Sequence, residues 1–207
     1  MNTAVLTPRP ATGSAVASRA LDTGLWVFIA VASTLFALFL SAYVMRMDGA
    51  ADWSTLALPR QLWLSSALLL AGSLLLQRAA AAARGARWPA ARSLLLAGGV
   101  CAMAFIGVQL WAWQSLLAAR VGLAGNPAAS FFYVLTALHG LHVLGGLVAW
   151  ASAMPTAASP PPEPARVARR IALCARYWHF LLAVWAVLFA TLGGLTPDVV
   201  RFICGRG

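Results

Sequence analysis

Three histidines stand out in this sequence as side chains that could do chemistry in an apolar environment. His139 and His142 lie in the uncharged segment FFYVLTALHGLHVLGGLVAW, which covers residues 131–150. His179 begins the last apolar segment, in YWHFLLAVWAVLF. Imidazole nitrogens can bind a metal or haem, carry protons or form hydrogen bonds. Because polar rings are costly at membrane depth, they usually have partners and often a function.

The spacing of the histidines limits what they can bind. His139 and His142 are three residues apart, so they share one face of a helix, together with Gly146, which would allow another helix to approach closely. One face cannot supply both axial ligands of a haem, so His179 would have to be the second ligand. In the helices expected below, His142 and His179 differ in depth by roughly 7 Å. The pattern favours hydrogen-bonded packing or interface histidines over a lipid-headgroup or proton-antenna function, and both over a metal or haem site.

The elements that must position these rings are membrane-spanning helices. The chain has 207 residues, of which 61% are hydrophobic and 10% are charged, and its mean hydropathy is +0.80. Soluble domains carry about 25% charged residues, and a helix needs ~20 apolar residues to cross a bilayer. We therefore predict an all-α integral membrane bundle of five transmembrane helices. The expected helices are at about 24–46, 60–80, 93–116, 130–152 and 176–196.

The segments outside these helices are expected to be short. Residues 1–23 have no apolar stretch typical of a cleavable signal, so we interpret them as a poorly ordered cytoplasmic tail. The proline-rich segment from Pro155 to Pro164 is expected to be a solvated cytoplasmic linker. Residues 197–207 form the C-terminal tail.

The arginines predict the orientation. All fifteen Lys+Arg residues are arginine, and ten of them fall in the N-terminal tail and in the second and fourth loops. The positive-inside rule then places the N-terminus in the cytoplasm and the C-terminus in the periplasm. The net charge of +10 is explained by topology and contact with anionic lipids rather than by nucleic-acid binding.

Acidic residues and cysteines exclude several functions. The acidic residues all lie outside the expected spans or at their edges: Asp22, Asp48, Asp52, Glu163 and Asp198. Ion-coupled transporters and proton pumps usually carry carboxylates within the membrane, so a self-contained proton path is not expected. Cys101, Cys174 and Cys204 are isolated and lack the spacing typical of zinc, copper or iron–sulfur sites. We expect no cofactor in this chain.

Two motifs, in this order on the last two helices, resemble subunit III of the haem–copper cytochrome c oxidases in its five-helix bacterial form. The first is HGLHVLG at 139–145, and the second is YWHF at 177–180, followed by Trp185. Gln109 and Trp113 are similar to the family's Q-x-x-E-W. The resemblance extends from about Leu25 to Leu192. Its matches near the first helix are Trp26, Phe28, Phe36, Tyr43 and Arg46.

The chain departs from the family at three carboxylates. Many members carry a glutamate in the middle of the first helix, where this chain has Ala32. The glutamate of Q-x-x-E-W is replaced by Ala112, and an aspartate after the W-H-F motif by Leu182. The carboxylates on which a proton-antenna function would depend are therefore missing.

The resemblance implies a non-catalytic subunit of a proton-pumping, dioxygen-reducing oxidase in the bacterial plasma membrane. Such a subunit packs on subunit I, in a complex with subunit II, and holds phospholipids, while haem and copper reside in the partner subunits. The candidate lipid or subunit-interface residues are His139, His142, Gln109, Trp113, Tyr177, Trp178 and His179. We expect the first three to form polar contacts inside the bundle, and Trp178 and His179 to lie at the cytoplasmic interface. No catalytic or metal-binding residue is expected.

Other functions are compatible with the sequence. Similar subunits accompany nitric oxide reductases and quinol oxidases, and the sequence identifies neither the electron donor nor the haem type of the partner. A different class of alternative is a stand-alone membrane cytochrome b or a transporter.

Overall fold

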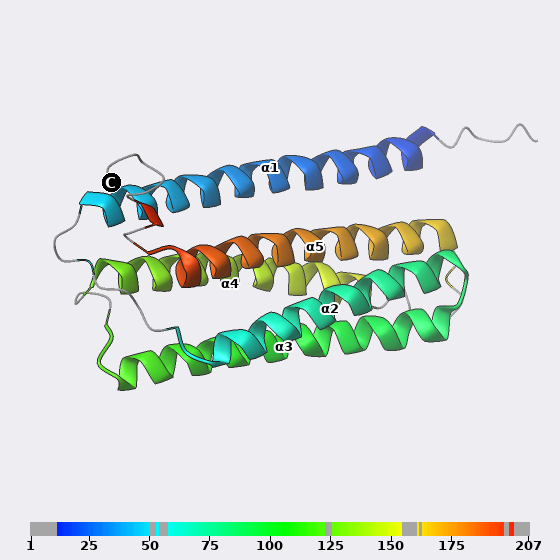
Figure 1. Cartoon of the computed structure of the whole chain (residues 1–207). Coiled ribbons are helices and arrows are strands. Elements are labelled where there is room, and N and C mark those ends of the chain that lie inside the picture. The colour runs from blue at the N-terminus through cyan, green and yellow to red at the C-terminus, as the bar shows by residue number, and fades with distance from the viewer. Residues whose placement is uncertain are drawn as a thin grey trace, which may run out of the picture.

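The computed structural model is an all-helical bundle, as expected (Figure 1). The structure describes residues 12–49, 53, 58–122, 126–154, 161, 163–196 and 199–200. Its helices are α1 (Thr12–Gly49), α2 (Gln61–Arg84), α3 (Trp88–Ala118), α4 (Pro127–Ala153) and α5 (Pro164–Gly194). All five are long and apolar enough to cross a membrane, which confirms the predicted fold class.

Two helices begin well before the positions expected from the sequence. α5 begins at Pro164 rather than near residue 176, and α1 begins at Thr12 rather than near residue 24. Residues 12–23 are therefore helical and not an unstructured tail, whereas residues 1–11 and most of the expected proline-rich linker lie outside the described residues. The charge-free runs mark the part of a helix that lies in hydrocarbon, but arginine and alanine are good helix formers and continue the helix beyond it.

The beginning of α4 and the turn between α2 and α3 have clear local causes. The side chain of Asn126 accepts a hydrogen bond of 3.0 Å from the backbone N–H of Ala128, and Pro127 occupies the first position of α4. α2 ends where Ala86 takes a left-handed conformation with φ of 53°. This places α3 antiparallel to α2 after only a three-residue turn.

The helices pack in an order that differs from their order in the chain. α2 and α3 form a closely packed hairpin, α5 lies against both α2 and α4, and α1 packs mainly on α4 and α5. Figure 1 shows that the start of α1, the α2–α3 turn and the start of α5 lie at one end of the bundle. At the α2–α3 contact, a Cβ atom on Gly98 would come within 2.9 Å of the Leu76 side chain.

A tryptophan joins α3 to α4 near this end. The indole nitrogen of Trp150 donates a hydrogen bond of 2.7 Å to the backbone carbonyl of Leu95, one turn before Gly99. A Cβ atom on Gly99 would collide with the Trp150 ring, so the indole lies directly on the glycine backbone. Gly99 thus makes room for the ring that connects the two helices.

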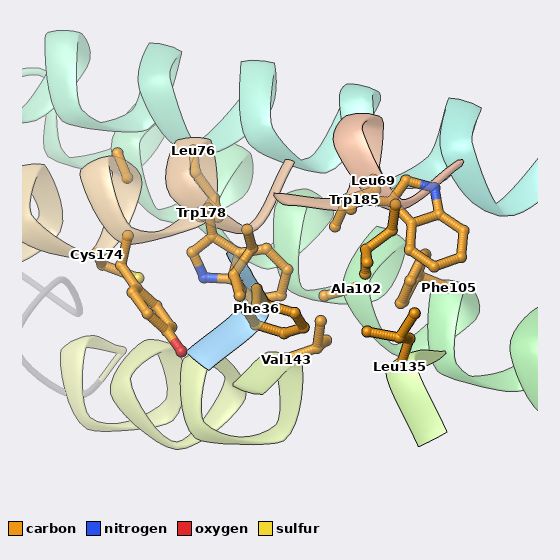
Figure 2. Close-up of a cluster of buried hydrophobic side chains, with 14 of the residues drawn as sticks. Phe36, Leu69, Leu76, Ala102, Phe105, Leu135, Val143, Cys174, Trp178 and Trp185 are labelled. Atoms are coloured by element: carbon orange, nitrogen blue, oxygen red, sulfur yellow. The ribbon is translucent and has the colours of Figure 1, made fainter. Parts of the chain in front are cut away.

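The core lies where α2, α3, α4 and α5 meet. Its largest fully buried side chains include Phe105, Phe132, Trp178 and Trp185, several of which are drawn in Figure 2. Phe105 and Trp185 meet edge to face, with ring centroids 5.4 Å apart. Apolar side chains also cover the outside, as in Val148 with 71% exposure. Apolar residues on both the inside and the outside are typical of helices in lipid.

Candidate functional site

His139 lies in the centre of the bundle and is fully buried. Three aromatic rings from three other helices surround it. Its ring centroid is 5.2 Å from that of Trp185 in α5, 5.8 Å from Phe105 in α3 and 6.4 Å from Phe36 in α1. The first histidine of the pair is therefore enclosed by side chains of this chain and faces neither lipid nor another subunit.

His139 does not form the polar contacts expected from the sequence. Neither of its ring nitrogens has a hydrogen-bond partner among the residues that the structure describes. Gln109 in α3 is also buried, and its side-chain oxygen and nitrogen are likewise unpartnered within the described part of the chain. Both residues lie inside the bundle, as predicted, but the predicted polar contacts are not made with the described residues.

Gln109 occupies the same layer of the bundle as His139. One turn before Gln109, the ring of Phe105 contacts His139. One turn after Gln109, the indole nitrogen of Trp113 donates a hydrogen bond of 3.1 Å to the hydroxyl of Thr136. Because α3 and α4 run antiparallel, Gln109 lies at the level of the turn of α4 between Thr136 and His139.

His142 faces α1 instead of the centre. Its Nδ1 lies 2.7 Å from the carbonyl oxygen of Leu138, and since a carbonyl can only accept, Nδ1 carries the proton and donates. The imidazole centroid is 5.8 Å from that of Phe28 and 5.3 Å from that of Phe36. Ala32, which is buried, lies midway between these two phenylalanines on α1. The position at which the resemblance implies a glutamate is therefore on the side of α1 that packs on His142.

Tyr177 connects α5 to the backbone of α4 at His142. Its hydroxyl donates a hydrogen bond of 2.9 Å to the carbonyl oxygen of His142. One turn along α4, a Cβ atom on Gly146 would lie 3.1–3.3 Å from Tyr177, Trp178 and Leu181. The prediction that Gly146 permits close approach of another helix is confirmed.

His179 faces α2, in contrast to His139 in the centre of the bundle and His142 beside α1. Its side chain is exposed, and its Nδ1 lies 2.8 Å from the hydroxyl of Ser73 in α2 and 3.0 Å from the carbonyl oxygen of Ala175. Tyr177, Trp178 and Leu181 pack on Gly146, four residues along α4 from His142, so His179 lies about one helical turn from the level of His142. The two rings also point toward different helices. Among the described residues, no group of three or more His, Cys, Asp or Glu could hold a metal ion.

Two other predicted interface residues lie in or near the core. Trp178 is fully buried rather than exposed to lipid headgroups, since its ring packs on Gly146, and α5 extends another 14 residues toward its beginning at Pro164. Trp113 is half-buried and packs edge to face on Tyr133. Ser66 was not among the predicted site residues, yet its hydroxyl accepts a hydrogen bond of 2.8 Å from Trp185. The available signal was a hydroxyl within an apolar segment, where it needs a partner.

An apolar groove of about 550 Å³ opens beside Tyr177, between α1, α4 and α5. Its walls include Leu25, Phe28, Ala149 and Cys174, and its few polar lining residues include Arg170 and Ser152. The groove was not predicted, because it depends on how α1 lies across the other two helices.

Charged and aromatic groups hold α1 in place beside this groove. Arg169 of α5 forms an ion pair with Asp22 of α1, and both side chains are about one third exposed. The guanidinium of Arg176 lies 5.8 Å from the centre of the Trp26 ring. These contacts lie at the end of the bundle where the loops carry most of the arginines.

Comparison with known proteins finds relatives that share one name, whereas no family model matches the chain. A probable cytochrome c oxidase subunit 3 of Nocardia farcinica is 33% identical over 88 residues. That alignment covers 42% of this chain and 43% of the relative, so it spans less than half of either protein.

Two longer alignments cover most of the membrane domain. The cytochrome c oxidase subunit 3 of Synechocystis sp. is 28% identical over 170 residues, which is 80% of this chain and 72% of the relative. That of Alkalihalophilus pseudofirmus is 27% identical over 173 residues, or 82% of this chain and 84% of the relative. The chain is thus a multi-pass membrane protein with homologues named cytochrome c oxidase subunit 3, two of which match about four fifths of its length.

Proposed function

We propose that this chain is the non-catalytic subunit III of a respiratory haem–copper terminal oxidase. The observation that carries the proposal is the similarity to two subunits of that name over about four fifths of the chain. In this function the subunit packs on subunit I, in a complex with subunit II, and stabilises the proton-pumping, dioxygen-reducing complex. Haem and copper then reside in those partner subunits.

The proposed location is the bacterial plasma membrane, with the N-terminus in the cytoplasm and the C-terminus in the periplasm. Supporting this orientation, the beginning of α1, the α2–α3 turn and the beginning of α5 lie at the same end of the bundle (Figure 1). The segments toward that end carry nine of the twelve arginines that the structure describes. The positive-inside rule assigns such an end to the cytoplasm.

The exposed apolar side chains support packing against lipid and partner subunits. The outer side of α1 is largely exposed, with Trp26, Val31 and Leu38 each more than half accessible. Because the charged residues lie near the ends of the helices, these surfaces fit hydrocarbon or the apolar helices of a larger subunit.

The groove between α1, α4 and α5 supports the proposal that the subunit holds phospholipid. Its apolar walls suit acyl chains, and the guanidinium of Arg170 suits a phosphate. Tyr177, a predicted lipid or interface residue, lines this groove. His142 stabilises the same region from the other side, because its ring contacts Phe28, which is also part of the groove wall.

Purification through an affinity tag on this chain, in a mild detergent, tests the proposal. We expect a haem- and copper-containing partner to co-purify, with oxygen consumption driven by reduced cytochrome c. Oxidation of quinol or reduction of nitric oxide would reassign the complex to a quinol oxidase or a nitric oxide reductase. A colourless, solitary monomer would contradict a subunit function.

A variant at His142 separates a structural function from a cofactor function. We expect His142→Leu to reduce assembly or the lipid content of the complex while leaving the haem content per subunit I unchanged. The matched control is His179→Leu, at an exposed histidine that faces α2 instead. A Soret band lost with His142→Leu from the isolated chain would instead identify a membrane cytochrome.

A further inference from the structure

Among the described residues, three side chains bury nitrogen or oxygen atoms without a hydrogen-bond partner: His139, Gln109 and Trp178. In His139 and Gln109 every side-chain nitrogen and oxygen is affected, four atoms in all. Both side chains are at least nine-tenths buried. In folded proteins the great majority of buried polar groups have a partner, and a group without one in the protein is commonly satisfied by an ordered water.

The two side chains lie at the same level of the contact between α3 and α4. Phe105 contacts His139, and Trp113 donates its hydrogen bond to Thr136, so the intervening turn of α3 faces the intervening turn of α4. Gln109 lies in that turn of α3. A small molecule between the helices could therefore reach both side chains.

The surroundings of His139 restrict what its partner can be. The rings of Phe36 and Phe105 offer no nitrogen or oxygen, and the indole nitrogen of Trp185 already donates to Ser66. A lipid headgroup or a side chain of another subunit cannot reach a ring that has no exposed surface. The partner must be small, and it must be able both to donate and to accept a hydrogen bond.

We propose that a buried water molecule bridges His139 and Gln109 between α3 and α4. A neutral imidazole has one N–H donor and one acceptor nitrogen, and a glutamine side chain has an acceptor oxygen and a donor amide. One water can accept the imidazole N–H and donate to Oε1 of Gln109, so that both residues are connected. This inference goes beyond the proposed function and does not depend on it.

The chain contains three histidines, which makes their ring nitrogens convenient probes. The full-length protein is produced with ¹⁵N-labelled histidine and placed in lipid nanodiscs. His142→Leu and His179→Leu assign the three ring signals, and transfer of magnetisation from water to each ring N–H is then measured. We expect transfer to His139 despite its burial. His142 is the internal comparison, because its Nδ1–H is occupied by the carbonyl of Leu138.

The variant Gln109→Met keeps the length of the side chain and removes its hydrogen-bonding groups. We expect the transfer from water to His139 to fall several-fold, with the His142 and His179 signals unchanged as evidence that the fold is retained. Absence of transfer to His139 in the wild-type protein would overturn the proposal, even if the variant does not fold. Unchanged transfer in Gln109→Met would also overturn it. A shift of the His139 signal in that variant without any water transfer would show a direct contact with Gln109 instead.

Discussion

The hydroxyl of Tyr177 in α5 donates its hydrogen bond to the backbone carbonyl of His142 in α4, and not to any side chain. This carbonyl belongs to the same residue whose imidazole packs on Phe28 and Phe36 of α1. One residue of α4 thus contacts α5 through its backbone and α1 through its side chain. The histidine motif of α4 and the tyrosine of YWHF hold three helices together.

Removal of the Tyr177 hydroxyl should weaken the bundle. We expect Tyr177→Phe to lower the free energy of unfolding by about 0.5–1.5 kcal/mol, because the α4–α5 hydrogen bond is lost while the ring remains. Unfolding by sodium dodecyl sulfate, followed by circular dichroism, measures the change. Thr191→Val in α5 is the control, since that hydroxyl bonds only to the carbonyl of Val187 in its own helix. Equal losses in both variants would contradict the interpretation.

Substitution of two glycines of α3 by alanine should have different effects on the stability of the protein. A Cβ atom on Gly99 collides with Trp150, whereas one on Gly107 has no atom within 4 Å. We expect Gly99→Ala to destabilise the protein by about 1–3 kcal/mol through overpacking. Gly107→Ala should be neutral, or stabilising by up to about 1 kcal/mol, since alanine favours helix. The same unfolding assay compares them, and the prediction fails if Gly99→Ala is as stable as the wild-type protein.

A carboxyl group restored on α1 should couple to His142. Ala32 faces that ring between Phe28 and Phe36, and the family resemblance assigns a glutamate to its position. We expect Ala32→Glu to destabilise the chain less when His142 is present than in the His142→Leu background, with a coupling of about 1 kcal/mol or more. A double-mutant cycle of unfolding free energies measures this.

The neighbouring position is the control for that cycle. Val31 is 63% exposed on the outer side of α1, so Val31→Glu should show no coupling to His142. Equal coupling at both positions would mean that α1 does not present Ala32 to this ring.

The groove beside Tyr177 should bind less lipid when the positive charge of Arg170 is removed. We expect Arg170→Gln to reduce the number of phospholipids that remain bound after purification, because the phosphate loses its charged partner. Native mass spectrometry counts the bound lipids. Arg92→Gln is the control, because Arg92 lies near the same end of the bundle, on α3, and does not line the groove. Equal lipid numbers in wild-type protein and Arg170→Gln would exclude Arg170 from lipid binding.

The fold was largely predictable because charge is excluded from hydrocarbon, so charge-free runs marked all five helices. The ends of the helices were not predictable from charge. The segment before Arg176 carries arginines and is nevertheless the first part of α5. A helix of 31 residues is ~46 Å long, whereas the hydrocarbon core is ~30 Å thick.

The site was only partly predictable, because it depends on the rotation of each helix about its own axis, which decides which side chains point into the bundle. In lipid, both sides of a helix are apolar, so hydrophobic periodicity does not distinguish the core from the outside. Small residues did predict some helix contacts. Gly146, for example, was correctly predicted to lie where another helix approaches closely. The shared level of Gln109 and His139 and the contact of Trp150 with Gly99 depend on the register between helices, which the sequence alone does not contain.

The packing order of the helices has a consequence for how the protein is made. The α2–α3 hairpin can form as soon as its two helices have left the ribosome, since only a three-residue turn separates them. α1 is synthesised first, yet it packs mainly on α4 and α5, which are synthesised last. The first helix to enter the membrane therefore cannot make its main native contacts until the final two helices have been inserted.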